Sequence, residues 1–174
     1  MDNVLDFIYN EILRRVKASS IYSESNPNKV RPGNIAEYST ADRTKRLLSL
    51  ADYPALQIIW GAFTPDSANS NSDNYKCTVE LELPTGTLVY KRYNELALGL
   101  IEVCNSFKGL NRRVGNARVY GATIGAVSPI TYSPNRGEGQ VECWTCQTSI
   151  EFNVAIERNR ALWEMNLQNE SIEE

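Results

Sequence analysis

The chain has 174 residues, of which 42% are hydrophobic and 22% are charged, as in an ordinary globular protein with one substantial core. Its 18 basic and 21 acidic residues leave a formal charge of −3, which argues against a dedicated nucleic-acid-binding protein with a basic face. There is no histidine, so the Ser–His–Asp and Cys–His catalytic constellations are excluded.

The N-terminal segment predicts neither a signal peptide nor a membrane anchor. Asp2 and Asp6 stand where a signal peptide would be basic, and no run of about 18 apolar residues occurs. We therefore expect a cytosolic protein with no membrane contact, whose four cysteines are thiols. Residues 2–17 predict an amphipathic helix with one apolar stripe, formed by Val4, Leu5, Ile8, Ile12 and Val16.

Two polar segments predict protruding loops that contact partners. Residues 19–40 contain Pro27, Pro32 and Gly33 and predict an arm without regular structure. Residues 64–74 consist of turn-forming residues and predict a second loop. The candidate contact residues in the two loops are Asn26, Lys29, Arg31, Asp66, Asn69, Asn71 and Asp73.

The segments between and after these loops predict a short helix, two strands and a second long helix. Residues 41–50 predict the short helix, and residues 53–63 predict a strand that is covered on both faces or meets another subunit. Residues 75–83 predict an alternating strand with Glu80 and Glu82 facing solvent. The second helix begins at about Tyr90 or Asn94 and extends to Phe107. Its expected buried face consists of Ala97, Leu100, Ile101, Cys104 and Phe107.

A basic cluster follows the second helix. It consists of Lys108, Arg112, Arg113 and Arg118. Residues 111–116, which include two of these arginines, predict a loop. Two interpretations of the cluster are open. It would bind phosphates or an acidic patch on a partner, or it would be a solvated helix end and loop without a partner. Residues 117–127 predict a strand containing two glycines, and residues 128–140 predict another loop.

The longest two-residue alternation in the chain, from Val141 to Ile156, predicts a long strand with one buried and one wet face. Its even positions, from Trp144 to Ile156, are almost all apolar. Its polar positions are Thr145, Gln147, Ser149, Glu151 and Asn153. Residues 159–174 predict a short helix and an acidic tail.

Cys143 and Cys146 form a Cys-x-x-Cys motif, which suggests a zinc ligand pair or a redox dithiol. Zinc would need a second ligand pair, and a redox dithiol works best at a helix N-terminus. Here the motif continues into strand alternation, which directs the two side chains to opposite faces. We therefore expect two ordinary small side chains.

The order of elements predicts an α+β domain over residues 1–158. We expect a mostly antiparallel sheet of about four strands, flanked by an N-terminal and a central amphipathic helix, with long polar loops. This order, with YPALQIIWGAF as an early strand, NELALGLIEVCNSF as the central helix and QTSIEFNVAI as the closing strand, resembles the tail terminator (tail-completion, neck) proteins of tailed bacteriophages.

The resemblance implies a structural virion protein without enzymatic activity or cofactor. Such subunits form a ring, commonly a hexamer, that caps the tail tube and docks onto the neck or head connector, while genomic DNA passes through the lumen without sequence-specific binding. The polar positions of the long strand would then line the lumen or meet a neighbouring subunit. The alternatives are a neck or head–tail connector ring, and a cytosolic zinc or thiol protein built on Cys143 and Cys146.

Overall fold

The computed structural model describes residues 3–39, 53–68, 72–86, 89–132, 143–159 and 161, which form an α+β fold. Its elements are α1 (Val4–Ala18), the 3-10 turn η1 (Pro32–Asn34), β1 (Ile35–Ser39), β2 (Leu56–Ala68), β3 (Ser72–Pro84), α2 (Tyr90–Asn105), β4 (Asn111–Val114), β5 (Ala117–Ile124), β6 (Ser128–Tyr132) and β7 (Cys143–Glu157). The α+β class and the two helices are confirmed. The sheet has seven strands in the described ranges, not about four.

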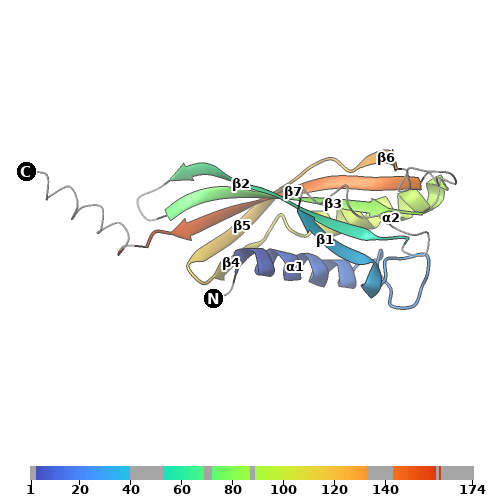
Figure 1. Cartoon of the computed structure of the whole chain (residues 1–174), viewed down its shortest axis with the longest axis horizontal. Coiled ribbons are helices and arrows are strands. Elements are labelled where there is room, and N and C mark those ends of the chain that lie inside the picture. The colour runs from blue at the N-terminus through green and yellow to red at the C-terminus, as the bar shows by residue number, and fades with distance from the viewer. Residues whose placement is uncertain are drawn as a thin grey trace, which may run out of the picture.

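The sheet is mixed and mostly antiparallel, and β7 is its frame (Figure 1). The strand order is β1-β2-β3-β7-β5-β4, in which only the β1–β2 pair is parallel. β3 pairs with β7 from Ser72–Glu157 to Pro84–Thr145, while β5 and then β6 share the other side of β7. The β5–β7 register shifts at Gly121, whose φ of 58° is a conformation that favours glycine.

Both helices pack on one face of this sheet and close a single large core with it. α1 contributes Ile8, Ile12 and Val16, each with 0% of its surface exposed. The Phe107 ring, just after α2, meets the Phe152 ring of β7 edge to face at 5.2 Å between centroids. The sheet extends past the N-terminal end of α1, where β2, β3 and β7 continue without a covering helix (Figure 1).

The prediction of an arm without regular structure over residues 19–40 is correct for residues 19–31, which have no helix or strand, but wrong for residues 35–39 and for the protrusion of the segment. Ile21 and Val30 are fully buried, and the Val30 amide donates to the Ile21 carbonyl oxygen at 2.9 Å. Residues 35–39 form β1, which adds a parallel edge strand to β2. Two isolated apolar side chains therefore fix a polar segment to the core, because burying each of them favours docking by roughly 1.5–3 kcal/mol.

Parts of three other predicted loops are strands, while residues 69–71 and 133–140 of these loops lie outside the described residues. Residues 64–68 continue β2 and residues 72–74 begin β3, so the segment is an extended hairpin. Residues 111–114 form β4, and Gly115 at φ 59° turns the chain into β5. Residues 128–132 form β6. The predicted helix over 41–50 and most of the C-terminal helix and tail lie outside the described residues.

The predicted alternation of β7 is largely confirmed. Cys146, Ile150, Phe152 and Val154 are fully buried on the helix-bearing face. Thr145 was expected on the wet face but is 2% exposed. Alternation fixes the face on which a side chain lies, and it does not fix whether that face is covered.

Two further predictions of side-chain burial are wrong. Glu82 was expected in solvent but is 7% exposed, and Ile101 was expected in the core but is 37% exposed. The buried side of α2 instead includes Leu96 and Val103. Neither described helix is long and apolar enough to span a bilayer.

Candidate interaction surfaces

Three of the four cysteines, Cys77, Cys104 and Cys146, are buried, whereas the side chain of Cys143, the first cysteine of the motif, lies outside what the structure describes. Cys146 lies in the core with its sulfur 3.9 Å from the Tyr93 carbonyl oxygen. Burial raises the pKa of the Cys146 and Cys104 thiols to about 12 and that of Cys77 to about 11. A thiol with such a pKa is a poor nucleophile and a poor metal ligand near neutral pH. No group of three or more His, Cys, Asp or Glu side chains among the described residues is arranged to hold a metal.

The polar face of β7 forms a row with the polar face of β3. Gln147, Ser149, Glu151 and Asn153 are half-buried and lie opposite Glu82, Glu80, Thr78 and Lys76 of β3, respectively. The Lys76 ammonium contacts the Glu151 carboxylate at 3.3 Å. Four of the five predicted positions therefore share one accessible strip on the face opposite the helices, and only the buried Thr145 is outside it.

The residues of the predicted contact loops separate into two places. Asn26 and Lys29 lie beside α2, whereas Asp66 and Asp73 lie near the tip of the β2–β3 hairpin. Asp73 accepts hydrogen bonds from the Arg158 guanidinium at 2.9 and 3.1 Å. Arg31 is half-buried just before η1. Asn69 and Asn71 lie outside the described residues.

The basic cluster is placed mainly on the β4–β5 hairpin. Arg113 and Arg118 occupy directly opposed positions in the β4–β5 ladder, and both are exposed. Arg113 pairs with Glu157 at 3.0 Å. Arg112 is exposed in the same short strand, and Lys108 lies in the turn that leads into it. Like charges directly opposite one another destabilise a strand pair, so this hairpin is suited to an anionic partner.

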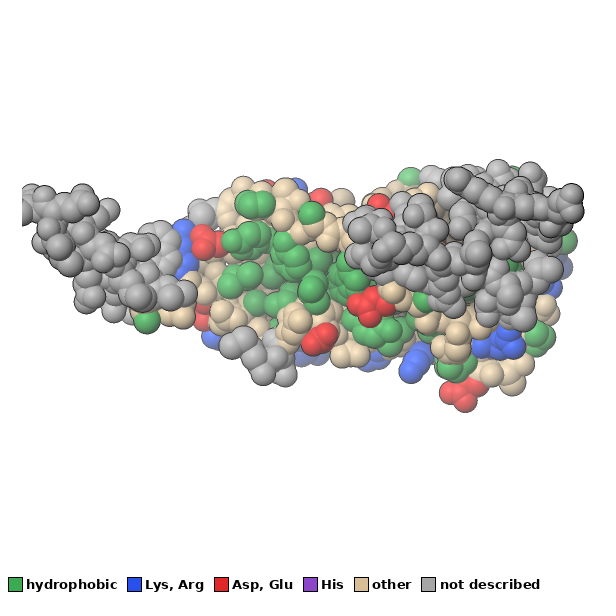
Figure 2. All heavy atoms as spheres, in the orientation of Figure 1, with side chains coloured by type: hydrophobic (Ala, Val, Ile, Leu, Met, Phe, Trp, Pro, Cys, Tyr) green, Lys and Arg blue, Asp and Glu red, His purple; other side chains and the backbone are tan. Residues whose placement is uncertain are grey.

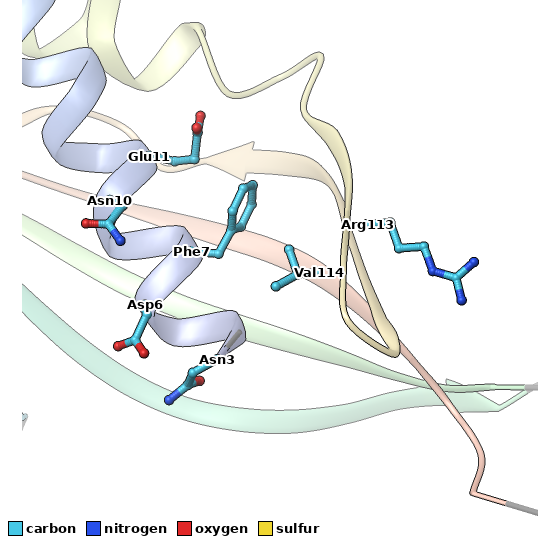
Figure 3. A pocket seen from close by; sticks show the side chains of 7 residues that line it. All are labelled: Asn3, Asp6, Phe7, Asn10, Glu11, Arg113 and Val114. Carbon is cyan, nitrogen blue, oxygen red and sulfur yellow. The ribbon is translucent and has the colours of Figure 1, made fainter. Parts of the chain in front are cut away.

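A seam between α1 and this hairpin encloses about 330 Å³ (Figure 3). Phe7 and Val114 lie at its base, while the Asp6 and Arg113 side chains point away from each other (Figure 3). The Glu11 carboxylate at its rim accepts hydrogen bonds from Arg14 and Arg15, and the bond from Arg14 is the largest cause of its lowered pKa. Its groups do not converge on a common point, so the seam has no catalytic geometry.

Two apolar surfaces are exposed among the described residues, and the strand predicted over residues 53–63, which was expected to be covered on both faces or to meet another subunit, contributes to the first. The first lies at the outer end of the sheet, which we define as residues 61–68, 72–77, 111–120 and 152–157. It is the part of that end around Phe63 and Tyr75, beyond the buried Cys77 and Val154. Here Phe63, 37% exposed, meets the Tyr75 ring edge on at 6.3 Å. Figure 2 shows hydrophobic side chains gathered on this part of the molecule.

The second surface is the outward side of α2, with Leu98 63% exposed. The run Leu96 to Ile101 contains more apolar residues than one helix face can bury, and this was the signal available in the sequence. Neither a protein-family model nor a curated protein sequence matches this chain.

Proposed function

We propose that the chain is a structural virion protein, a ring-forming subunit that terminates a bacteriophage tail tube and joins it to the head or neck. The observation that carries this proposal is the uncovered outer end of the sheet. Phe63 and Tyr75 lie on the same face as the buried Cys77, because Phe63 pairs with Cys77 and Tyr75 is two residues before it. A face that continues the core but has no helix over it is suited to burial against another molecule.

The edge of the same hairpin supports the proposal. Among the described residues, β1 pairs with β2 only as far as Trp60, so residues 61–68 have no strand on that side. A long free edge is a site for pairing with another chain, and folded proteins usually cover or shorten it. The hairpin thus combines an exposed apolar face and an unpaired edge, as expected of a subunit that is completed by assembly.

The polar strip on the other face supports the remaining part of the proposal. The strip carries the carboxylates of Glu80 and Glu151, and its ammonium group, that of Lys76, is paired with Glu151. With so little positive charge available for phosphates, DNA can pass this surface without being held. The partners are other copies of the chain, the tail tube protein and the neck or head connector protein. A neck or connector ring has the same requirements, and the two are separated by whether the ring binds isolated tubes or isolated connectors.

Measurement of mass in solution tests the proposal. The purified chain is expected to form a closed ring, commonly of six copies, seen by native mass spectrometry and electron microscopy. Phe63→Asp is expected to weaken this assembly at unchanged helix and strand content, because it places a charge on the apolar face. A chain that stays monomeric, both alone and with tail tubes or connectors present, would contradict the proposal.

A further inference from the structure

The outward side of α2 has the character of a binding surface. Four of the five large exposed hydrophobic side chains in the described ranges belong to α2 or to the residue before it: Val89, Tyr90, Leu98 and Ile101. Glu95 and Glu102 are three residues before and four residues after Leu98, and both are exposed. This spacing places the exposed Leu98 between two carboxylates on one helix face.

A groove of about 500 Å³ borders this helix face. Its other wall is the segment 20–29, from which Asn26, Asn28 and Lys29 line it. A Cβ atom at Gly99 would lie 2.3 Å from Ile21 Cγ2, so the absence of a side chain allows this segment to lie directly on α2. Because Ile21 is fully buried, the wall is fixed before any partner binds. We call Glu95, Leu98, Glu102 and the lining residues of this segment, Ser20, Asn26, Asn28 and Lys29, the α2 groove.

The charge of the α2 groove is complementary to that of the β4–β5 hairpin. The groove has two carboxylates against the single ammonium of Lys29. The hairpin carries three exposed arginines. Of these three, only Arg113 has an ion pair within the described residues. Arg112 and Arg118 therefore have guanidinium groups available for carboxylates, the groups to which arginine binds most specifically.

The two surfaces lie at opposite ends of the elongated fold (Figure 1). The hairpin is part of the outer end, whereas α2 covers the half of the sheet near the start of β7, where Cys146 contacts Tyr93. They therefore cannot meet within one molecule, but they can meet between two. A contact between unlike surfaces of identical chains is heterologous, and it generates a ring when the rotation closes.

We propose that the α2 groove of one copy binds the β4–β5 hairpin of the next copy. Glu95 and Glu102 pair with Arg112 and Arg118, and the hairpin covers Leu98. This inference rests on the proposed function, because it names the contact by which the proposed ring closes. It also gives a role to the basic cluster, which then serves the protein and not DNA.

Charge reversal on each surface tests the contact by sedimentation velocity. The variants are Glu95→Lys/Glu102→Lys and Arg112→Glu/Arg118→Glu, with circular dichroism to establish folding. Each variant alone is expected to lose self-association by about tenfold or more in dissociation constant, since close charge pairs across interfaces are coupled at this level or above. An equimolar mixture is expected to regain assembly, because each copy then meets an oppositely charged neighbour at both surfaces.

A single substitution serves as the control. Lys17→Glu reverses one exposed charge outside both surfaces, and it should assemble like the wild type. If a charge-reversal variant does not fold, Glu102→Gln and Arg112→Gln replace it and should weaken assembly in the same direction. A wild-type ring that is unaffected by either reversal, or is not restored in the mixture, overturns this contact but leaves the ring proposal standing. A monomeric wild-type chain that binds no tube or connector overturns both.

Discussion

Replacement of Phe152 by alanine tests whether β7 is the frame of the core. Phe152 is fully buried, and its ring packs edge to face on Phe107 at an interplanar angle of 86°. Deleting a buried phenylalanine side chain costs about 3–5 kcal/mol through lost transfer free energy and the cavity that remains. The aromatic pair contributes about 0.5–1.5 kcal/mol more than its buried area, so we expect a loss near the upper end of that range.

The assay is equilibrium unfolding in urea, followed by circular dichroism at a concentration where the chain is monomeric. Phe63→Ala is the matched control, since it removes the same side chain from the same face where that face is partly exposed. The control should cost less than about half as much stability but should weaken self-association. A loss below about 1 kcal/mol for Phe152→Ala would mean that the core is assigned to the wrong face of the sheet.

Two further predictions concern α2. In an isolated helix, Gly99→Ala would increase stability by about 1 kcal/mol. In this protein we expect a net loss of stability in urea unfolding, because the new Cβ overlaps Ile21 Cγ2 and overpacking costs about 1–3 kcal/mol. Increased stability would show that segment 20–29 does not pack on α2. The Cys104 thiol has a folded pKa of about 12 against an ordinary value of 9.0, so above pH 9 the unfolded chain loses this proton first and stability falls as pH rises. Cys104→Ala should therefore make the alkaline decline in unfolding free energy shallower by about 1 kcal/mol per pH unit, and an unchanged slope would contradict the buried thiol.

The helices and strand faces followed from side-chain periodicity, because burial of one face produces a regular pattern in the sequence. The pattern predicted the inward side of β7 as far as Val154 and the inward side of β3 from Cys77 to Leu83. It could not predict how far strands extend through polar sequence. Residues 64–68 and 72–74 consist of turn formers, yet they are strands because β7 continues to Glu157 and supplies β3 with a partner. Tertiary pairing here overrides local propensity.

Other features were signalled in the sequence and were not recognised. Gly115-Asn116, between two short runs that both contain β-branched residues, is a typical two-residue hairpin turn, and it joins β4 to β5. Ile21 and Val30 were the only large aliphatic residues between Ala18 and Gly33, which indicates docking points in an otherwise polar segment. The sequence alone places Arg113 and Arg118 in one basic cluster, but their direct opposition depends on the hairpin register, which a loop over residues 111–116 does not predict.

The distribution of charge between the two ends of the molecule restricts how copies can assemble. A symmetric dimer in which one surface meets its own copy would place the β4–β5 hairpin against a second set of arginines, or the α2 groove against a second pair of carboxylates. Both arrangements are repulsive, whereas alternation of the hairpin with the groove pairs every Arg112 with a carboxylate. An antiparallel dimer that pairs each hairpin with the groove of its partner would satisfy the same charges. The proposed ring differs from that dimer because it should pass from monomer to one larger closed species without a stable dimer. Native mass spectra that show a predominant dimer would contradict this mode of assembly, and a continuous series of masses would show that the contact repeats without closing.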